Sequence, residues 1–225
     1  MLIDLHTHSY PQSDDAFMAV DELIDAAKSR GLDGICLTDH DRFWTQDQVD
    51  ELSKKHGFLV LGGSEVNTDT GHVIVFGLET YVFGLHKPAF LHRQVAACGG
   101  AMIAAHPHRR RFLEDPGHLP EARAEMLKKA CSDEFFKMCD AVEGLNGRAT
   151  LVQNSFSQDL TQRMGARMAA GSDAHRPEQV GTAATRFDRR VTGLADLITE
   201  LKAGRFRAVD LTNGHREIPD DAGSR

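Results

Sequence analysis

Seven short apolar runs are spread along the chain, and longer stretches with helical periodicity separate them. The runs cover residues 1–3, 34–37, 58–61, 73–76, 101–104, 141–142 and 168–170. Apolar runs of this length, bounded by turn residues, are typical of buried strands. The amphipathic stretches between them predict helices at residues 20–30, 45–55, 88–98, 119–130 and 194–202.

Strands that alternate with helices indicate parallel strands with the helices outside. In the first predicted helix, Leu23, Ile24 and Ala27 share one face, and Gly31 supplies a C-cap. About seven strand–helix units fit into the chain, which is the pattern of an α/β barrel. The sequence therefore predicts an α/β fold of barrel type.

Candidate metal ligands follow these apolar runs closely. His6 and His8 follow the first run, His40 the second, Glu65 the third and His106 the fifth, while Asp173 and His175 follow the last. The carboxyl ends of barrel strands are where such folds gather their active sites. We therefore expect these side chains to meet at one mouth and to bind a cluster of metal ions.

The spacing within two of these motifs indicates shared faces. Residues two apart on a strand point the same way, so His6 and His8 can bind one ion. Asp173 and His175 have the same spacing, and Asp173 can join that ion if the first and last strands are neighbours. The alternative for Asp173 is a helix N-cap. Glu65 is assigned a bridging role between two ions, against the alternative of an exposed loop residue.

The remaining candidates would complete the ligand sets of further ions. His72, which opens a predicted strand, and His106 would share the ion bridged by Glu65, unless His72 is a surface histidine. His40 and His175 would need a loop carboxylate, for which Asp14 or Asp15 is the candidate.

Three further side chains could belong to this site. Asp39 could orient the His40 ring. Glu143 ends a strand and could be a ligand, a base or a brace for a ligand. Trp44 could line the pocket or pack in the core.

The composition is that of an ordinary globular protein, with 41% hydrophobic and 26% charged residues. A formal net charge of -7 argues against a nucleic-acid-binding basic face, although metal ions could still attract a phosphorylated small molecule. We expect a small phosphorylated substrate as the partner, with nucleic acid less favoured and no membrane. No apolar stretch could span a bilayer and no signal peptide is evident.

The expected organisation is one domain at residues 1–212 and a flexible tail at 213–225. Residues 108–120 are expected to loop over the mouth of the barrel. The four cysteines form no C-x-x-C pair, which favours free thiols over disulfides and a reducing, cytoplasmic location.

Six ordered motifs resemble the PHP (polymerase and histidinol phosphatase) family. They are Asp-Leu-His-Thr-His-Ser at 4–9, Thr-Asp-His at 38–40, Glu65 with Gly71-His72, Ala-His-Pro at 105–107, Glu-Gly-Leu-Asn at 143–146 and Gly-Ser-Asp-Ala-His at 171–175. The H-x-H pair alone is weak evidence, whereas six motifs in order are specific. The resemblance runs from residue 4 to about residue 187.

The resemblance implies a distorted TIM-like (β/α)7 barrel and a phosphoesterase with two to three divalent ions, Zn, Mn or Fe. It assigns three ligand sets: His6, His8, Glu65 and Asp173; Glu65, His72 and His106; and His40, His175 and the carboxylate of Asp14 or Asp15. The family's loop carboxylate often stands five residues after the second histidine, whereas Asp14 is six after it. Asp15 therefore remains the alternative ligand.

A metal-activated hydroxide is the expected nucleophile, with Glu65 and His175 in catalytic roles. Arg109 is expected to contact the substrate phosphate and take part in catalysis, and Arg148 and His108 to contact the substrate. Two other readings stay open. One is a metal-dependent amidohydrolase, although no bridging lysine is evident, and the other is a non-catalytic metal-stabilised module.

Overall fold

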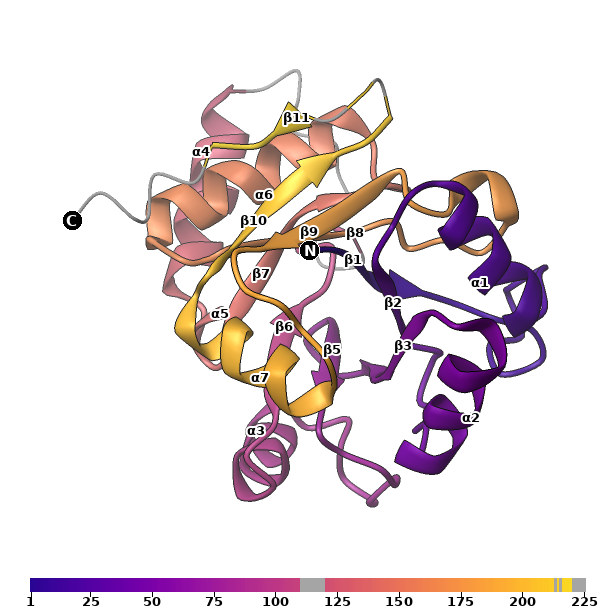
Figure 1. Ribbon diagram of the computed structural model, residues 1–225. Helices are drawn as coiled ribbons and strands as arrows, with labels where there is room; N and C mark the ends of the chain where they lie inside the picture. The colour runs from indigo at the N-terminus through magenta and orange to yellow at the C-terminus, as the bar shows by residue number, and fades with distance from the viewer. Residues whose placement is uncertain (110–119, 213, 215, 220–225) are drawn as a thin grey trace.

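The computed structural model describes residues 1–109, 120–212, 214 and 216–219. Its strands are β1 (Leu2–Thr7), β2 (Gly34–Leu37), β3 (Leu59–Gly62), β4 (Ser64–Asn67), β5 (His72–Phe76), β6 (Ala101–Ala104), β7 (Ala141–Asn146), β8 (Met168–Gly171), β9 (Ala183–Phe187), β10 (Phe206–Asp210) and β11 (Arg216–Glu217). Its helices are α1 (Val20–Ser29), α2 (Gln46–His56), α3 (Pro88–Ala97), α4 (Pro120–Ser132), α5 (Glu134–Lys137), α6 (Leu151–Met164) and α7 (Leu194–Ala203), with a 3₁₀ turn at Pro177–Gln179. The α/β class predicted from the sequence is confirmed (Figure 1).

The strands of the described residues form two sheets, with the orders β11-β10-β9-β1-β2-β3 and β4-β5-β6-β7-β8. β1, β2 and β3 are parallel to one another, as are β6, β7 and β8. β5, β9 and β10 pair antiparallel with their neighbours, so the expectation of parallel strands throughout was wrong. Strands β4, β9 and β10 had not been predicted, because β4 carries polar functional residues and the other two lack a long apolar run.

The two sheets adjoin at two junctions. At the first junction β3 passes through Gly63 directly into β4, and a Cβ at Gly63 would come within 2.8 Å of the Phe76 ring. At the second junction the backbone N–H of Asp173 donates to the His6 carbonyl at 2.7 Å, and the backbone N–H of His8 donates to the Ala174 carbonyl at 3.0 Å. The carboxyl ends of β1 and β8 therefore lie side by side, as the ligand assignment requires.

The helices form where the sequence caps them. Thr45 accepts a hydrogen bond from the Gln48 amide in a capping box before α2, and Gly57 ends that helix with φ of 57°. Thr150 makes the same capping box before α6, a helix that the sequence analysis did not predict. Helices α4 and α6 pack together beside β7, whereas α1 and α2 lie beside the first sheet (Figure 1).

Part of the expected tail is ordered. Arg216 and Glu217 pair with β10, and Ile218 is buried against Leu145 and Ala208. Residues 213, 215 and 220–225, and 110–119 of the loop expected over the mouth, lie outside the described residues.

All four cysteines are free, with Cys36 buried and Cys98 exposed. Among the described residues, no helix is both long and apolar enough to cross a membrane.

Gly171 is a point where the fold tolerates no side chain. A Cβ there would lie 2.4 Å from the Cβ of His6 and 2.9 Å from its amide nitrogen. We expect Gly171→Ala to lower the free energy of unfolding by about 1–3 kcal/mol, the usual cost of overpacking. Thermal unfolding measures the loss. Gly193→Ala is the matched control, because a Cβ at Gly193 meets nothing within 4 Å. Equal melting temperatures for the two variants would contradict the close packing of β8 on β1.

Candidate metal centre

The predicted ligands converge on one cavity of about 260 Å³. Its lining residues are Asp15, His40, Glu65, His72, His106, Arg109, Arg148, Asp173 and His175. His6 and His8 lie beneath them, fully buried at the end of β1. The strand ends thus bring together side chains that are up to 169 residues apart in the sequence, from His6 to His175.

Three atoms of the first predicted set lie close enough together to hold one metal ion. Glu65 Oε2 lies 3.3 Å from the Nε2 atoms of both His6 and His8. Asp173 Oδ1 lies 3.6 Å and 3.4 Å from the same two nitrogens. Ligands held at about 2.1 Å from a tetrahedral ion are about 3.4 Å apart. These distances therefore suit a divalent cation on His6, His8 and Glu65, with Asp173 beside the two histidines.

Three of these atoms take part in no hydrogen bond, although His40 Nδ1 also lies 3.0 Å from Glu65 Oε2. Nε2 of His6, Nε2 of His8 and Oε2 of Glu65 are buried and accept or donate no hydrogen bond. Buried polar atoms without partners are rare and costly, and a bound ion is one of the explanations for them. A divalent cation would satisfy all three at once, so the residues present fit the metal that the resemblance implied.

Glu65 also faces a second group through its other oxygen. Its Oε1 lies 2.6 Å from His72 Nδ1 and 2.8 Å from His106 Nε2. Because the two oxygens of one carboxylate face separate histidine groups, Glu65 has the geometry of a bridge between two ions. The second predicted set is therefore assembled in the structure.

The third group gathers around the His40 and His175 rings. His8, His40 and His175 each offer a nitrogen within the reach of one ion. Asp15 Oδ2 lies 2.9 Å from His175 Nε2 and 3.5 Å from His40 Nε2. Asp14 and Asp15 are both exposed, but only Asp15 lines the cavity. The geometry therefore favours Asp15 over Asp14, because Asp15 is the one that contacts His175 and His40.

Glu143, whose role the sequence left open, braces the first group. Its Oε1 accepts from His6 Nδ1 at 2.9 Å, and its Oε2 accepts from the His106 amide at 2.8 Å. A proton on Nδ1 leaves the Nε2 lone pair of His6 facing the metal position. Glu143 thus fixes the ring orientation of one predicted ligand and the backbone of another.

His8 has an equivalent brace that the sequence analysis missed. Ser13 Oγ donates to Asp39 Oδ1 at 2.9 Å, and it lies 3.2 Å from His8 Nδ1 and 3.0 Å from the His40 amide. Because the Ser13 hydroxyl donates its single proton to Asp39, its oxygen can only accept hydrogen bonds from the His8 ring and from the His40 backbone N–H. His8 therefore carries its proton on Nδ1 and offers Nε2 to the metal position. Nothing in the sequence distinguishes Ser13 from other loop serines.

This network corrects the expectation for Asp39 and decides between the two alternatives for Trp44. Asp39 was expected to orient the His40 ring, but its carboxylate instead accepts from Ser9, Ser13 and the Trp44 indole. Trp44 is 8% exposed and packs with the core. Its role is therefore to hold Asp39 from the core side.

Two of the predicted ligands have unusual backbones. Asp173 has φ of 54° and His106 has φ of 26°, in the left-handed region that residues other than glycine rarely adopt. Such conformations persist only where surrounding contacts impose them, and they concentrate at functional sites. At Asp173 one such contact is the hydrogen bond that its backbone N–H donates to the His6 carbonyl.

The charges of the site call for a cation. Burial disfavours imidazolium, yet the carboxylates around His6 outweigh it and raise its pKa well above the usual value. The pKa of His8 is raised to about 9 against the same burial penalty, chiefly by Asp173 and Glu65. Burial and repulsion from His8 lower the pKa of His175 to about 4. The metal-free protein thus holds protons on His6 and His8 where metal ions would otherwise supply positive charge.

The predicted substrate-binding residues separate into two groups. Arg109 donates to Asp173 Oδ2 and to Asn146 Oδ1, and the Arg148 guanidinium lies 2.8 Å from His175 Nδ1. Both arginines line the cavity. His108 was expected to face the substrate, but it is 5% exposed, packs edge-on against Phe156 and is not part of the lining. The chain turns its ring away from the mouth and into the helix packing.

Two family models match the chain. One, described as PHP domain, matches residues 4–158, and another, described as PHP-associated, matches residues 152–206. An uncharacterized protein of Methanocaldococcus jannaschii is 30% identical over 118 residues, which make up 48% of this chain and 68% of that protein. The first match covers more than half of the chain and confirms the resemblance found in the sequence.

Solved structures share the fold. One is a two-domain protein from Bacteroides vulgatus containing a predicted PHP-like metal-dependent phosphoesterase, with a TM-score of 0.65 and 19% identity. The similarity covers 92% of this chain but only 64% of that longer protein. Another is an amidohydrolase from Chromobacterium violaceum with bound sulfate and no metal, with a TM-score of 0.54, 19% identity and coverage of 80% of this chain and 89% of that one.

The two loop carboxylates provide a matched test of the third group. We expect Asp15→Asn to lower the metal content of the purified protein by one ion per chain. The reason is that the side chain at position 15, which contacts His175 and His40, loses its negative charge. Asp14→Asn should keep the content of the parent protein. Elemental analysis of both variants measures this, and the reverse result would restore Asp14 as the ligand.

Metal binding at pH 7 should release protons. His8 has a pKa of about 9 in the metal-free protein and is therefore charged at pH 7, whereas a metal ligand must be neutral. Because this pKa is raised, the release from His8 should disappear as the pH rises above 9. Calorimetric zinc titrations in buffers of different ionisation enthalpy count the protons. No release at pH 7 would contradict the assignment of His8 as a ligand.

Proposed function

This chain belongs to the PHP domain family, and we propose that it is a phosphoesterase that hydrolyses a small phosphate ester with the help of two to three divalent metal ions. The observation that carries the proposal is the position of Glu65. Its two oxygens face separate histidine groups at 2.6–3.3 Å, which is the arrangement of a carboxylate shared by two ions. Two ions about 3.5–4 Å apart form the recurrent centre of phosphoester hydrolysis.

The proposal assigns each ligand set. His6, His8, Glu65 and Asp173 would hold one ion; Glu65, His72 and His106 a second; and His40, His175 and Asp15 a third. Nitrogen and oxygen ligands without thiolates suit Zn, Mn or Fe. Bound ions of this kind lower the pKa of water to about 7 and neutralise phosphoryl oxygens. As part of the same proposal, the two sheets are the halves of a distorted barrel with the ions at its strand ends.

Among the described residues, Arg109 and Arg148 are our candidates for binding the phosphate. Both enter the metal cavity, and Arg109 already forms hydrogen bonds with a carboxylate oxygen and an amide oxygen. Guanidinium groups bind phosphate oxygens with the same paired geometry. They would orient the ester and balance its charge.

His175 serves this site as a neutral base and ligand. Its lowered pKa of about 4 leaves the ring uncharged at pH 7, so it has no proton to spare for a leaving alkoxide. A proton for the leaving group would therefore have to come from another source than His175. Its catalytic role, in our proposal, is to complete the third ion site with His40.

The cavity favours a small substrate. A volume of about 260 Å³ lies at the low end for ligand pockets, and the lining residues are nearly all charged or imidazole side chains. The net charge of -7 disfavours long polyanions. A nucleotide or similar phosphomonoester fits both observations better than a polymer does. A reducing cytoplasm is the location that the free thiols favour.

Amide hydrolysis is the second candidate. The Chromobacterium violaceum protein of similar fold is named an amidohydrolase, which is the observation that favours this candidate. The sulfate bound to that protein, in contrast, has the tetrahedral shape of phosphate. A cyclic amide such as dihydroorotate would test this alternative directly. A non-catalytic metal-stabilised module is the third reading.

The test combines metal content with turnover. Protein purified without a histidine tag is analysed for metals and assayed with p-nitrophenyl phosphate, bis-p-nitrophenyl phosphate and dihydroorotate. We expect two to three ions per chain and hydrolysis of the monoester. Hydrolysis of the cyclic amide alone would support the amidohydrolase reading, and tight metal binding with no turnover of any ester would support the module.

The two arginines should affect turnover differently from surface arginines. We expect Arg109→Ala and Arg148→Ala each to lower kcat/KM at least tenfold, equivalent to about 1.4 kcal/mol of transition-state stabilisation. Arg207→Ala is the control, because that side chain is exposed and pairs with Asp188. Steady-state kinetics with the monoester measure the effect. A loss below about threefold for Arg109→Ala would remove its phosphate-binding role.

A further inference from the structure

One buried amide joins a predicted ligand to its brace. Asn146, at the end of β7, is 1% exposed. Its Nδ2 donates to Glu143 Oε2 at 3.0 Å and to Asp173 Oδ2 at 3.2 Å. Its Oδ1 accepts from Arg148 N at 3.0 Å and from Arg109 Nη2 at 3.2 Å. Both amide protons and both lone pairs are therefore in use.

The carboxylate oxygens that Asn146 binds are the ones turned away from the metal position. Asp173 presents Oδ1 to the two histidines of the first group and Oδ2 to Asn146. Glu143 presents Oε1 to His6 and Oε2 to Asn146. The Asn146 side chain thus links the two carboxylates, together with Arg109 on Asp173 Oδ2 and the His106 backbone N–H on Glu143 Oε2.

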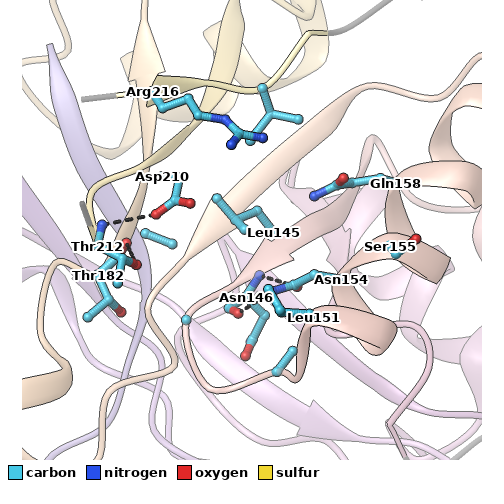
Figure 2. Close-up of a pocket in the computed structure, with 14 residues that line it drawn as sticks. Leu145, Asn146, Leu151, Asn154, Ser155, Gln158, Thr182, Asp210, Thr212 and Arg216 are labelled. Atoms are coloured by element: carbon cyan, nitrogen blue, oxygen red, sulfur yellow. Dashed lines mark hydrogen bonds between the residues drawn. The ribbon is translucent and has the colours of Figure 1, made fainter. Parts of the chain in front are cut away.

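Asn146 is itself held from the neighbouring helix. The side chain of Asn154, on α6, accepts a hydrogen bond from the backbone N–H of Asn146 at 2.9 Å and donates one to the backbone carbonyl of Asn146 at 3.0 Å. Figure 2 shows this pair of hydrogen bonds with the two side chains drawn together. Asn154 touches none of the predicted ligands in these contacts.

The space beside this pair is open. A cavity of about 280 Å³ is lined from α6 by Leu151, Asn154, Ser155 and Gln158, and from β7 by Leu145 and Asn146 (Figure 2). Shortening Asn154 would therefore enlarge an existing cavity and would leave the packed core intact. Gln158, one turn along the same helix and in the same cavity, offers a matched comparison.

We propose that Asn146 and Asn154 are positioning residues of the metal centre: Asn154 fixes the backbone of Asn146, whose amide aligns Asp173 and Glu143 for the first ion. This inference rests on the metal binding within the proposed function. Side chains that orient metal ligands typically contribute about 10–100-fold to metal affinity. The effect of Asn154 would reach the ion through two residues.

The test compares Asn154→Ala, Asn146→Asp and the control Gln158→Ala with the parent protein. Zinc affinity is measured by competition with a chromophoric chelator, and the visible absorption of the cobalt-substituted protein reports ligand geometry. Thermal unfolding of the metal-free proteins identifies any change in the fold. Asn146→Asp keeps the side-chain shape but places a carboxylate against two others, so its loss of affinity should be the largest.

We expect zinc affinity to fall about 10–100-fold in Asn146→Asp and several-fold in Asn154→Ala, with an altered cobalt spectrum in both. Gln158→Ala should match the parent protein. Affinity and spectra of Asn154→Ala equal to those of Gln158→Ala would overturn the proposal, as would a parent-like spectrum in Asn146→Asp. A parent protein that binds zinc but hydrolyses no ester would refute the proposed function and leave this comparison intact.

Discussion

The site depends on a buried excess of negative charge surrounded by imidazole rings. Glu65 and Asp173 are almost completely buried, and their pKa values are held well below the usual range, because desolvation is outweighed by the neighbouring histidines. Buried carboxylates persist only when a cation compensates them. Protons on the histidines or divalent ions can do so, and the spacing of the His6 and His8 nitrogens from Glu65 Oε2 and Asp173 Oδ1 suits the ions.

The fold serves this charge cluster by bringing strand ends together. β1 and β8 lie side by side through backbone hydrogen bonds at the site, and β3 turns through Gly63 into β4, which carries Glu65. Two of the candidate ligand rings are then oriented by an outer group, His6 by Glu143 and His8 by Ser13. The geometry thus comes from backbone pairing first and from side-chain hydrogen bonds second.

The sequence predicted the α/β class, the strands bearing ligands and most of the ligand clusters, because apolar runs and the histidine motifs are local signals. It did not predict the antiparallel strands β9 and β10, whose pairing depends on distant segments. Local spacing could not distinguish Asp14 from Asp15, since loop curvature decides which carboxylate turns inward. His108 was misassigned because the sequence does not reveal that its ring packs on Phe156.

The central claim is that Glu65 is shared between two metal ions. X-ray absorption spectroscopy on the zinc- or manganese-loaded protein tests this most directly. The account predicts nitrogen and oxygen ligands and a metal–metal distance of about 3.5–4 Å, which Glu65→Ala should abolish. A saturated protein with one ion per chain and no metal–metal scattering would contradict the account.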